Sequence, residues 1–140
     1  MGTMLQAAGL KMGVAPESMN LTAPEVVIDI HRQYIAAGSD IVYTNTFGAN
    51  RHKLARTEYS VAEIVRAGVA CARKAVDGTN AKVALDIGPI GQLIEPYGTM
   101  KFEEAYDVFR EMIEAGADVG ADWIAIETMT DLYEVKAAVL

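Results

Sequence analysis

The sequence predicts an α/β fold, a partial (β/α)8 TIM barrel of about three to four β/α units with parallel strands. Three short apolar runs, near residues 41–47, 82–87 and 123–127, are separated by helical stretches, as is typical of parallel strands buried on both faces. Polar residues gather at the end of each run. These ends recur at steps of 41 and 40 positions, from Phe47 to Gly88 and from Gly88 to Thr128. The spacing indicates repeated units whose functional residues lie at the carboxyl ends of the strands.

The length of the chain limits how much of a barrel it can form. A complete (β/α)8 barrel takes about 250 residues, whereas this sequence has 140 residues and three strand patterns. We therefore expect residues 1–140 to be one domain, the N-terminal part of a barrel truncated at both ends. No strand pattern occurs before residue 20, and a helical pattern still runs at Leu140. An open three-stranded sheet is the alternative, and it would leave both edges and much of one face uncovered.

The composition is that of a globular protein and argues against several classes of function. The net charge is −7 and the 12 Lys and Arg residues are scattered, so no basic stripe is available for nucleic acid. No apolar run approaches the roughly 18 residues that span a bilayer, and the first residues lack a secretory pattern, which predicts a cytoplasmic protein. Cys71 is the only cysteine. A disulfide framework is therefore ruled out, and a four-ligand zinc site would need carboxylates.

The N-terminal half contains a predicted helix before the first strand and a short one after it. Thr22-Ala23-Pro24-Glu25 is a capping box with Pro in the first turn, which predicts that a helix starts here. Apolar residues at helical spacing give this helix a buried face, and Gly38 is placed to end it. The strand near 41–47 follows, and a short helical turn is expected near 50–56.

The C-terminal half repeats the alternation of helix and strand. A second capping box, Ser60-Val61-Ala62-Glu63, opens a helix that leads to the strand near 82–87. A loop of about a dozen residues follows, longer than most connections, and long loops after strands are often functional. An amphipathic helix is expected near 102–118, the third strand near 123–127, and a last helix from Asp131.

Two carboxylates at strand ends are the main candidates for a functional site. Glu127 follows a buried strand, where an ionised side chain needs a partner, so we interpret it as functional rather than as a solvent-facing edge residue. Asp86 has the same place in the second unit, but it could instead accept backbone N–H bonds from the loop after it. Thr44, Asn45 and Thr46 supply two hydroxyls and an amide, and strand alternation turns Asn45 away from the threonines.

Other polar residues are interpreted as structural. Asp40 and Asp122 precede their strands, at the end where barrels carry stability rather than chemistry. Cys71 lies mid-helix between two alanines and is expected to be a small buried hydrophobe. His31 and His52 lack metal-ligand spacing, so both are expected to be solvated or locally bonded. The sequence thus predicts no metal ligand and no catalytic residue.

Five motifs occur in an order that matches a known family. They are Met1–Gln6, Asn20–Glu25, Thr44–Asn50, Asp86–Pro89 and Ile126–Met129. Over the whole chain they closely resemble the homocysteine-binding domain of the homocysteine S-methyltransferase family. Glu95-Pro96-Tyr97-Gly98, followed by Phe102-Glu103-Glu104-Ala105-Tyr106, favours the cobalamin-dependent methionine synthase branch over the betaine-dependent one.

The resemblance implies a barrel that transfers a methyl group to the thiol of homocysteine. A zinc ion held by three cysteines would bind the thiol as thiolate, and methylcobalamin, recharged from methyltetrahydrofolate on further domains, would supply the methyl group. The implied substrate-binding residues are Gly2, Thr3, Asn45, Thr46, Asp86 and Glu127. Backbone amides of Gly2 and Thr3 suit the substrate carboxylate and an ionised Glu127 suits its ammonium group, whereas the other three would line the pocket.

Two departures from the family pattern limit what this chain would do alone. The acidic residue and the strand that precede Met1-Gly2-Thr3 in the family are absent, and the zinc-binding cysteines belong to late strands, which Cys71 does not match. We therefore expect a fragment that is inactive alone and binds no zinc tightly. Its partners would be homocysteine, the rest of the barrel, and folate- and cobalamin-binding domains. The alternative is a half-barrel module that dimerises through open sheet edges.

Overall fold

Three short strands form one parallel sheet. The computed structural model describes residues 1–140, and its sheet contains β1 (Ile41–Tyr43), β2 (Lys82–Ile87) and β3 (Trp123–Ile126) in that order. Each strand pairs in parallel with the next one in the chain, which is how successive units of a β/α barrel are arranged. The predicted α/β fold with three parallel strands is confirmed.

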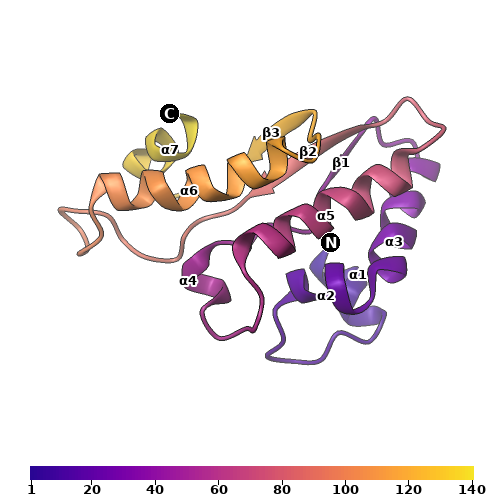
Figure 1. Cartoon of the computed structure of the whole chain (residues 1–140), viewed down its shortest axis with the longest axis horizontal. Helices are drawn as coiled ribbons and strands as arrows, with labels where there is room; N and C mark the ends of the chain where they lie inside the picture. Colours follow the sequence, from indigo (N-terminus) through magenta and orange to yellow (C-terminus); the bar gives the residue numbers. More distant parts are fainter.

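Helices connect the strands and form a layer on one side of the sheet. They are α1 (Gly2–Ala7), the 3-10 helix η1 (Pro16–Ser18), α2 (Met19–Thr22), α3 (Pro24–Ala36), α4 (Arg51–Leu54), α5 (Val61–Val76), α6 (Phe102–Ala117) and α7 (Leu132–Val139). The helices α3, α5, α6 and α7 pack against one another in chain order, and Figure 1 shows them following one another along the molecule. None of the helices is both long and apolar enough to cross a bilayer.

The main hydrophobic core lies between this layer and the sheet. Leu85 of β2, Val65 of α5 and Phe109 of α6 have no exposed surface, and burying a side chain of this size contributes about 1.5–3 kcal/mol. Gly116 lets α6 approach the sheet, because a Cβ at this position would lie 2.7 Å from the Leu85 side chain. The packing of α5 and α6 on β2 therefore holds the helical layer against the sheet.

The other face of the sheet is partly exposed. Tyr43, Ala84 and Trp123 lie opposite one another in adjacent strands, so their side chains share a face. Tyr43 and Trp123 are 47% and 62% exposed. The outer edges of β1 and β3 pair with no other strand. The chain therefore presents an apolar face and two free edges, the features that favour association.

The first strand is shorter than predicted. The sequence pattern continues to residue 47, but β1 ends at Tyr43. Thr44 still donates its N–H to the carbonyl of Ala84, and the N–H of Thr46 then turns back to the carbonyl of Thr44, each at 2.9 Å. The two threonine hydroxyls lie 2.6 Å apart and bond to the backbone of Asp86. Side-chain hydrogen bonds thus replace the strand ladder at this point.

The two predicted capping boxes have different outcomes. Ser60 caps α5 as predicted: its Oγ accepts the N–H of Glu63, and the Glu63 carboxylate accepts the N–H of Ser60. Thr22 does not cap α3, because its hydroxyl donates to the carbonyl of Ser18 at 3.1 Å. The segment before α3 is already helical, so α3 begins at Pro24 with no side-chain cap. The helix start was predicted correctly and its cap was wrong.

Asp122 fastens β3 at its N-terminal end. Its Oδ2 accepts the N–H of Val83 at 2.8 Å, and its Oδ1 lies 2.8 Å from the guanidinium of Arg73 on α5. The Arg73 guanidinium and then the Val83 N–H hold the pKa of Asp122 below its usual value. Asp40 takes part through its carbonyl, which accepts the N–H of Lys82 at 2.9 Å. The structural interpretation of Asp122 is confirmed, and that of the Asp40 side chain stays a prediction.

One histidine differs from the sequence expectation. Cys71 is buried in α5 as predicted, and His52 is locally bonded, with Nδ1 2.9 Å from Nε2 of Gln92. His31 is only 1% exposed, its Nε2 has no hydrogen-bond partner, and burial lowers its pKa to about 4. It lies four residues after the buried Val27, and so shares the core-facing side of α3.

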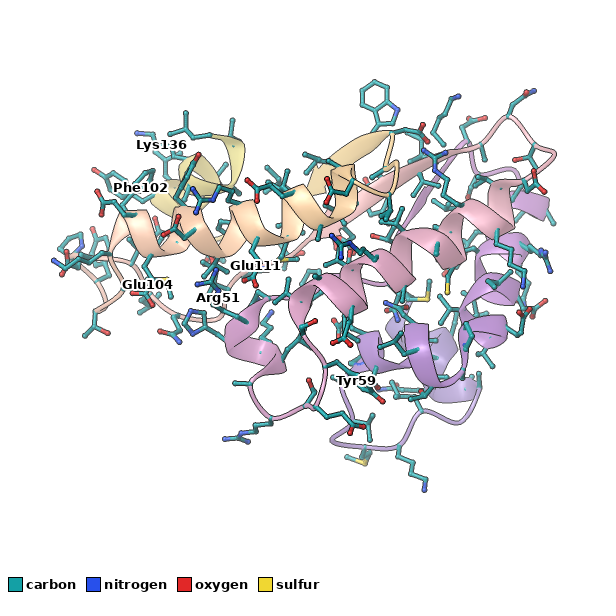
Figure 2. The ribbon with its side chains drawn as sticks, viewed as in Figure 1. Arg51, Tyr59, Phe102, Glu104, Glu111 and Lys136 are labelled. Atoms are coloured by element: carbon teal, nitrogen blue, oxygen red, sulfur yellow. The ribbon has the colours of Figure 1, made fainter.

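An ion pair ties the short helix α4 to the helical layer. Nε of Arg51 lies 2.7 Å from Oε2 of Glu111 on α6, and Figure 2 shows these two labelled side chains close together between α4 and α6. Arg51 also donates to the carbonyl of Asp107 at 3.2 Å. Both charged groups are exposed, so the pair contributes at most about 1 kcal/mol. Its effect is to orient α4 and the loop that leads to it from β1.

Candidate functional site

The carboxyl ends of the three strands surround one cavity of about 330 Å³. Its lining residues are Met1, Gly2, Pro16, Glu17, Thr44, Asn45, Phe47, Asp86, Glu127 and Thr128. Four of the residues predicted to bind substrate are among them, namely Gly2, Asn45, Asp86 and Glu127. The cavity therefore brings together residues from α1, η1 and the ends of all three strands, as expected for the functional end of a β/α sheet.

Asp86 is a buried carboxylate whose pKa is raised by its surroundings. It is the last residue but one of β2, it is 8% exposed, and its buried Oδ1 has no hydrogen-bond partner. Burial first, and then the charge of Glu127, raise the pKa of Asp86 to about 7, with Glu17 adding to the effect and the α-amino group of Met1 opposing it. The carboxylate does not brace the following loop, so the structural alternative for this residue is not realised.

Glu127 approaches Asp86 from the neighbouring strand. Its N–H donates to the carbonyl of Ile87 at 3.0 Å, so the pairing with β2 continues one residue past β3, and its side chain is half-buried. Thr128 then takes a left-handed backbone with φ of 61°, which is costly for a β-branched residue. This turn ends the strand directly after Glu127 and keeps that residue at the wall of the cavity.

Glu17 is a third acidic residue that the sequence analysis missed. It lies in η1, is 6% exposed, and accepts the N–H of Gly48 on Oε1 at 2.6 Å. A Cβ at Gly48 would lie 2.6 Å from the same oxygen, so only glycine leaves room for this contact. The two residues are 31 positions apart in the sequence. No helix or strand periodicity points to their meeting.

A pair of buried amides holds η1 and α2 against the end of β1. Asn45 donates from Nδ2 to the carbonyl of Pro16 at 2.8 Å and to Oδ1 of Asn20 at 3.0 Å. Asn20 donates in turn to the carbonyls of Asn45 at 2.8 Å and Ile64 at 3.3 Å. Buried amides with partners specify geometry. Asn45 thus lines the cavity and also fastens the segment that carries Glu17.

Two of the predicted site residues lie outside the cavity lining. Thr46 is fully buried, and its hydroxyl donates to the carbonyl of Asp86 at 2.7 Å. It therefore holds the backbone of Asp86 and does not line the cavity itself. Thr3 is exposed in the first turn of α1. The Gly2-Thr3 segment is helical. Its first N–H groups still lack intrahelical partners, as at every helix start.

The arrangement is suited to a small cation. Three carboxylates and no Lys, Arg or His side chain line the cavity. Ionised carboxylates accept charge-assisted hydrogen bonds from ammonium groups, and a cavity of about 330 Å³ has room for an amino-acid-sized ligand. The site therefore favours a ligand with a free amino group.

The side chains of this chain do not fit a zinc–thiolate site. No group of three or more His, Cys, Asp or Glu side chains is placed to hold a metal ion. Cys71 lies in α5 with its Sγ 3.8 Å from the carbonyl of Asn20, and burial raises the pKa of its thiol to about 11. A thiol must be ionised to bind zinc, and this one is held in the neutral form.

Known proteins resemble the chain over its full length. A sequence profile described as homocysteine S-methyltransferase matches residues 1–140. The methionine synthases of Mycobacterium tuberculosis and Mycobacterium leprae are 37% and 36% identical to the chain over 155 aligned positions. Each alignment covers 100% of this chain and 13% of the synthase. The chain thus spans only a small part of the length of these relatives.

The fold also matches a solved structure. The homocysteine methyltransferase MmuM from Escherichia coli, in its metallated form, superimposes with a TM-score of 0.85 at 25% identity. The apo form of the same protein superimposes with a TM-score of 0.70. The match to the metallated form covers 98% of this chain and 54% of that one, so this chain corresponds to about half the length of that protein.

Proposed function

The chain belongs to the homocysteine S-methyltransferase family, and on that basis we propose that it binds the amino-acid end of homocysteine in a domain that methylates the homocysteine thiol to give methionine. In this proposal residues 1–140 are the N-terminal part of a homocysteine-binding (β/α)8 barrel. The observation that carries the proposal is the cavity at the strand ends, which Asp86 and Glu127 line from adjacent strands.

The residues of the cavity have distinct roles toward the substrate. Glu127 accepts hydrogen bonds from the ammonium group. The free backbone N–H groups at Gly2 and Thr3, at the start of α1, donate to the substrate carboxylate. Asn45 lines the cavity, and Asp86 faces the same space from β2 with Thr46 behind its backbone.

The binding role is tested by titrating the chain with homocysteine and following the NMR shifts of the lining residues. Glu127→Gln is expected to weaken binding at least about tenfold, because a hydrogen bond to a charged partner contributes about 1.5–3 kcal/mol. Glu103→Gln is the matched control, because Glu103 is an exposed residue of α6 outside the cavity lining. Equal affinities for the two variants would count against the role of Glu127.

The thiol chemistry of the family needs groups that this chain does not supply. In the family a zinc ion stabilises the thiolate, and the residues present here do not fit that ion. Methylcobalamin and methyltetrahydrofolate, the expected methyl donors, are placed by this proposal on other domains. We predict that the 140-residue chain alone holds no zinc tightly and transfers no methyl group. Metal analysis of the purified chain, with an assay using methylcobalamin and homocysteine, tests this, and turnover with one tightly bound zinc would refute it.

A second candidate function is assembly through the uncovered side of the sheet. Tyr43 and Trp123 expose apolar surface there, and β1 and β3 have free edges, so a second copy or the remainder of the barrel could complete the sheet. Light scattering distinguishes the outcomes. A defined dimer that Trp123→Ser converts to a monomer would support self-association, and a monomeric wild-type chain would exclude it.

The proposal includes the partners and the location expected from the family. The partners are homocysteine, the remainder of the barrel, and folate- and cobalamin-binding domains. A cytoplasmic location agrees with a chain whose single cysteine, Cys71, is a buried free thiol, because disulfides are rare in reducing compartments.

A further inference from the structure

We propose that Asp86 holds a proton when no ligand is bound, that a bound ammonium group displaces this proton, and that Glu17 adds its negative charge to that of Glu127 in favouring the exchange. The inference rests on the proposed function, since the ammonium group is that of the substrate. It adds Glu17 to the substrate site and a proton-coupled step to ligand binding.

The geometry of the three carboxylates carries the argument. Glu17, Asp86 and Glu127 line one cavity from η1, β2 and the end of β3, and Glu17 and Asp86 are only 6% and 8% exposed. The charged groups that face Asp86 are the other two carboxylates and the α-amino group of Met1. With no Lys, Arg or His side chain in the lining, three ionised carboxylates would repel one another where solvent screening is weak.

Asp86 is the carboxylate that holds the proton. Glu17 has a hydrogen-bond partner, because its Oε1 accepts the N–H of Gly48 at 2.6 Å, and Glu127 is only half-buried. Asp86 has neither advantage, because it is buried and its Oδ1 has no partner. The same conclusion follows from its pKa, which burial and the charge of Glu127 raise to about 7.

An entering ammonium group reverses this balance. It brings one positive charge into the cavity, so the ionised form of Asp86 becomes favourable. The O–H bond of the Asp86 carboxyl breaks and its proton passes to solvent, while the ligand nitrogen keeps all of its protons. Charge is conserved, because one proton leaves the site for each ammonium bound to the newly ionised carboxylate.

Calorimetry of the chain with two ligands tests the exchange. Homocysteine and 4-mercaptobutyrate share the thiol and the carboxylate, and only homocysteine has the amino group. Titration in buffers of different ionisation enthalpy should show release of about half a proton per homocysteine at about pH 7 and nearly one at about pH 6, given a pKa of about 7. Below about pH 6, the affinity for homocysteine should increase about tenfold for each unit by which the pH rises. Binding of 4-mercaptobutyrate should release no proton.

A ligand-free measurement separates this inference from the proposed function. Carbon-13 NMR of the carboxyl groups, assigned with Asp86→Asn, should show Asp86 titrating near its raised pKa of about 7. Glu17→Gln, which can still accept the Gly48 N–H, should lower the pKa of Asp86, and Glu103→Gln should not.

If Asp86 titrates near 3.8, its ordinary value, the inference is refuted even if homocysteine binds. If homocysteine binds without proton release, the exchange alone is refuted. If homocysteine does not bind, the proposed function fails and the exchange with it.

Discussion

Replacing Gly48 with alanine tests the contact that holds Glu17 at the cavity. The Gly48 N–H donates to Oε1 of Glu17 at 2.6 Å, and a Cβ on residue 48 would lie 2.6 Å from the same oxygen. The carboxylate must move, and the loss of a buried hydrogen bond to a charged group costs about 1.5–3 kcal/mol. Alanine also lowers the entropy of the unfolded chain, which offsets about 0.4–1 kcal/mol. We expect Gly48→Ala to lower the free energy of unfolding by about 1–2 kcal/mol.

A double-mutant cycle with Glu17→Ala isolates this contact. Without the Glu17 carboxylate the added methyl group meets nothing closer than Cδ of Lys53 at 3.4 Å, so Gly48→Ala should then stabilise the chain by about 0.4–1 kcal/mol. Urea unfolding of the four proteins, followed by circular dichroism, should give a coupling free energy of about 1.5–3 kcal/mol. An equal cost of Gly48→Ala in both backgrounds would refute the reasoning.

The remaining predictions concern backbone strain, pH dependence and helix capping. Thr128→Gly should stabilise the chain by about 0.5–1 kcal/mol in urea unfolding, because it relieves the left-handed backbone at the expense of unfolded-state entropy. Thr130→Gly, at an exposed residue without positive φ, should destabilise the chain. If both substitutions stabilise the chain, Thr128 is not strained. Folding raises the pKa of Asp86 from 3.8 to about 7, so the folded chain binds this proton more tightly than the unfolded chain does. The contribution of Asp86 to the free energy of unfolding is therefore greatest below about pH 4 and falls as the pH rises to about 7. Asp86→Asn should remove this fall, of up to about 4 kcal/mol, from urea unfolding curves, and an unchanged pH slope would exclude it. Ser60→Ala should lower the free energy of unfolding by about 1 kcal/mol and the Tm by about 2–4 °C. Thr22→Ala should cost less, because Thr22 caps no helix. Equal losses of stability in the two variants would argue against Ser60 as the only cap of the two.

The sequence predicted the elements whose signals are local. The strand near 82–87 has the same limits in the structure, Lys82–Ile87, because five of its six residues are buried and Val83–Leu85 form an unbroken apolar run. The first strand was predicted too long because the hydroxyls of Thr44 and Thr46 bond to the neighbouring backbone, a competition that apolar patterning does not register. The cap at Thr22 failed for a similar reason, since its hydroxyl donates to the carbonyl of Ser18 at the end of η1.

The candidate site was predictable where it depends on strand ends. Asp86 and Glu127 could be placed together because the carboxyl ends of parallel strands meet at one edge of a sheet. Glu17 could not be found in this way, because η1 reaches the cavity through the Asn20–Asn45 amide pair and the contact with Gly48. These are tertiary contacts between segments far apart in the chain, with no periodicity to reveal them.

The anchoring of Asp122 has a consequence for ligand recognition at the far end of the same strand. Asp122 stands five positions before Glu127, and its bonds to the Val83 N–H and Arg73 set how β3 lies against β2. A parallel strand rises about 3.3 Å per residue, and a slip that keeps the same side chains inward covers two residues, or about 6.6 Å. Such a slip would separate Glu127 from a ligand held at Asp86. The partly exposed ion pair between Asp122 and Arg73 therefore helps to set the distance between Asp86 and Glu127, although it contacts neither of them.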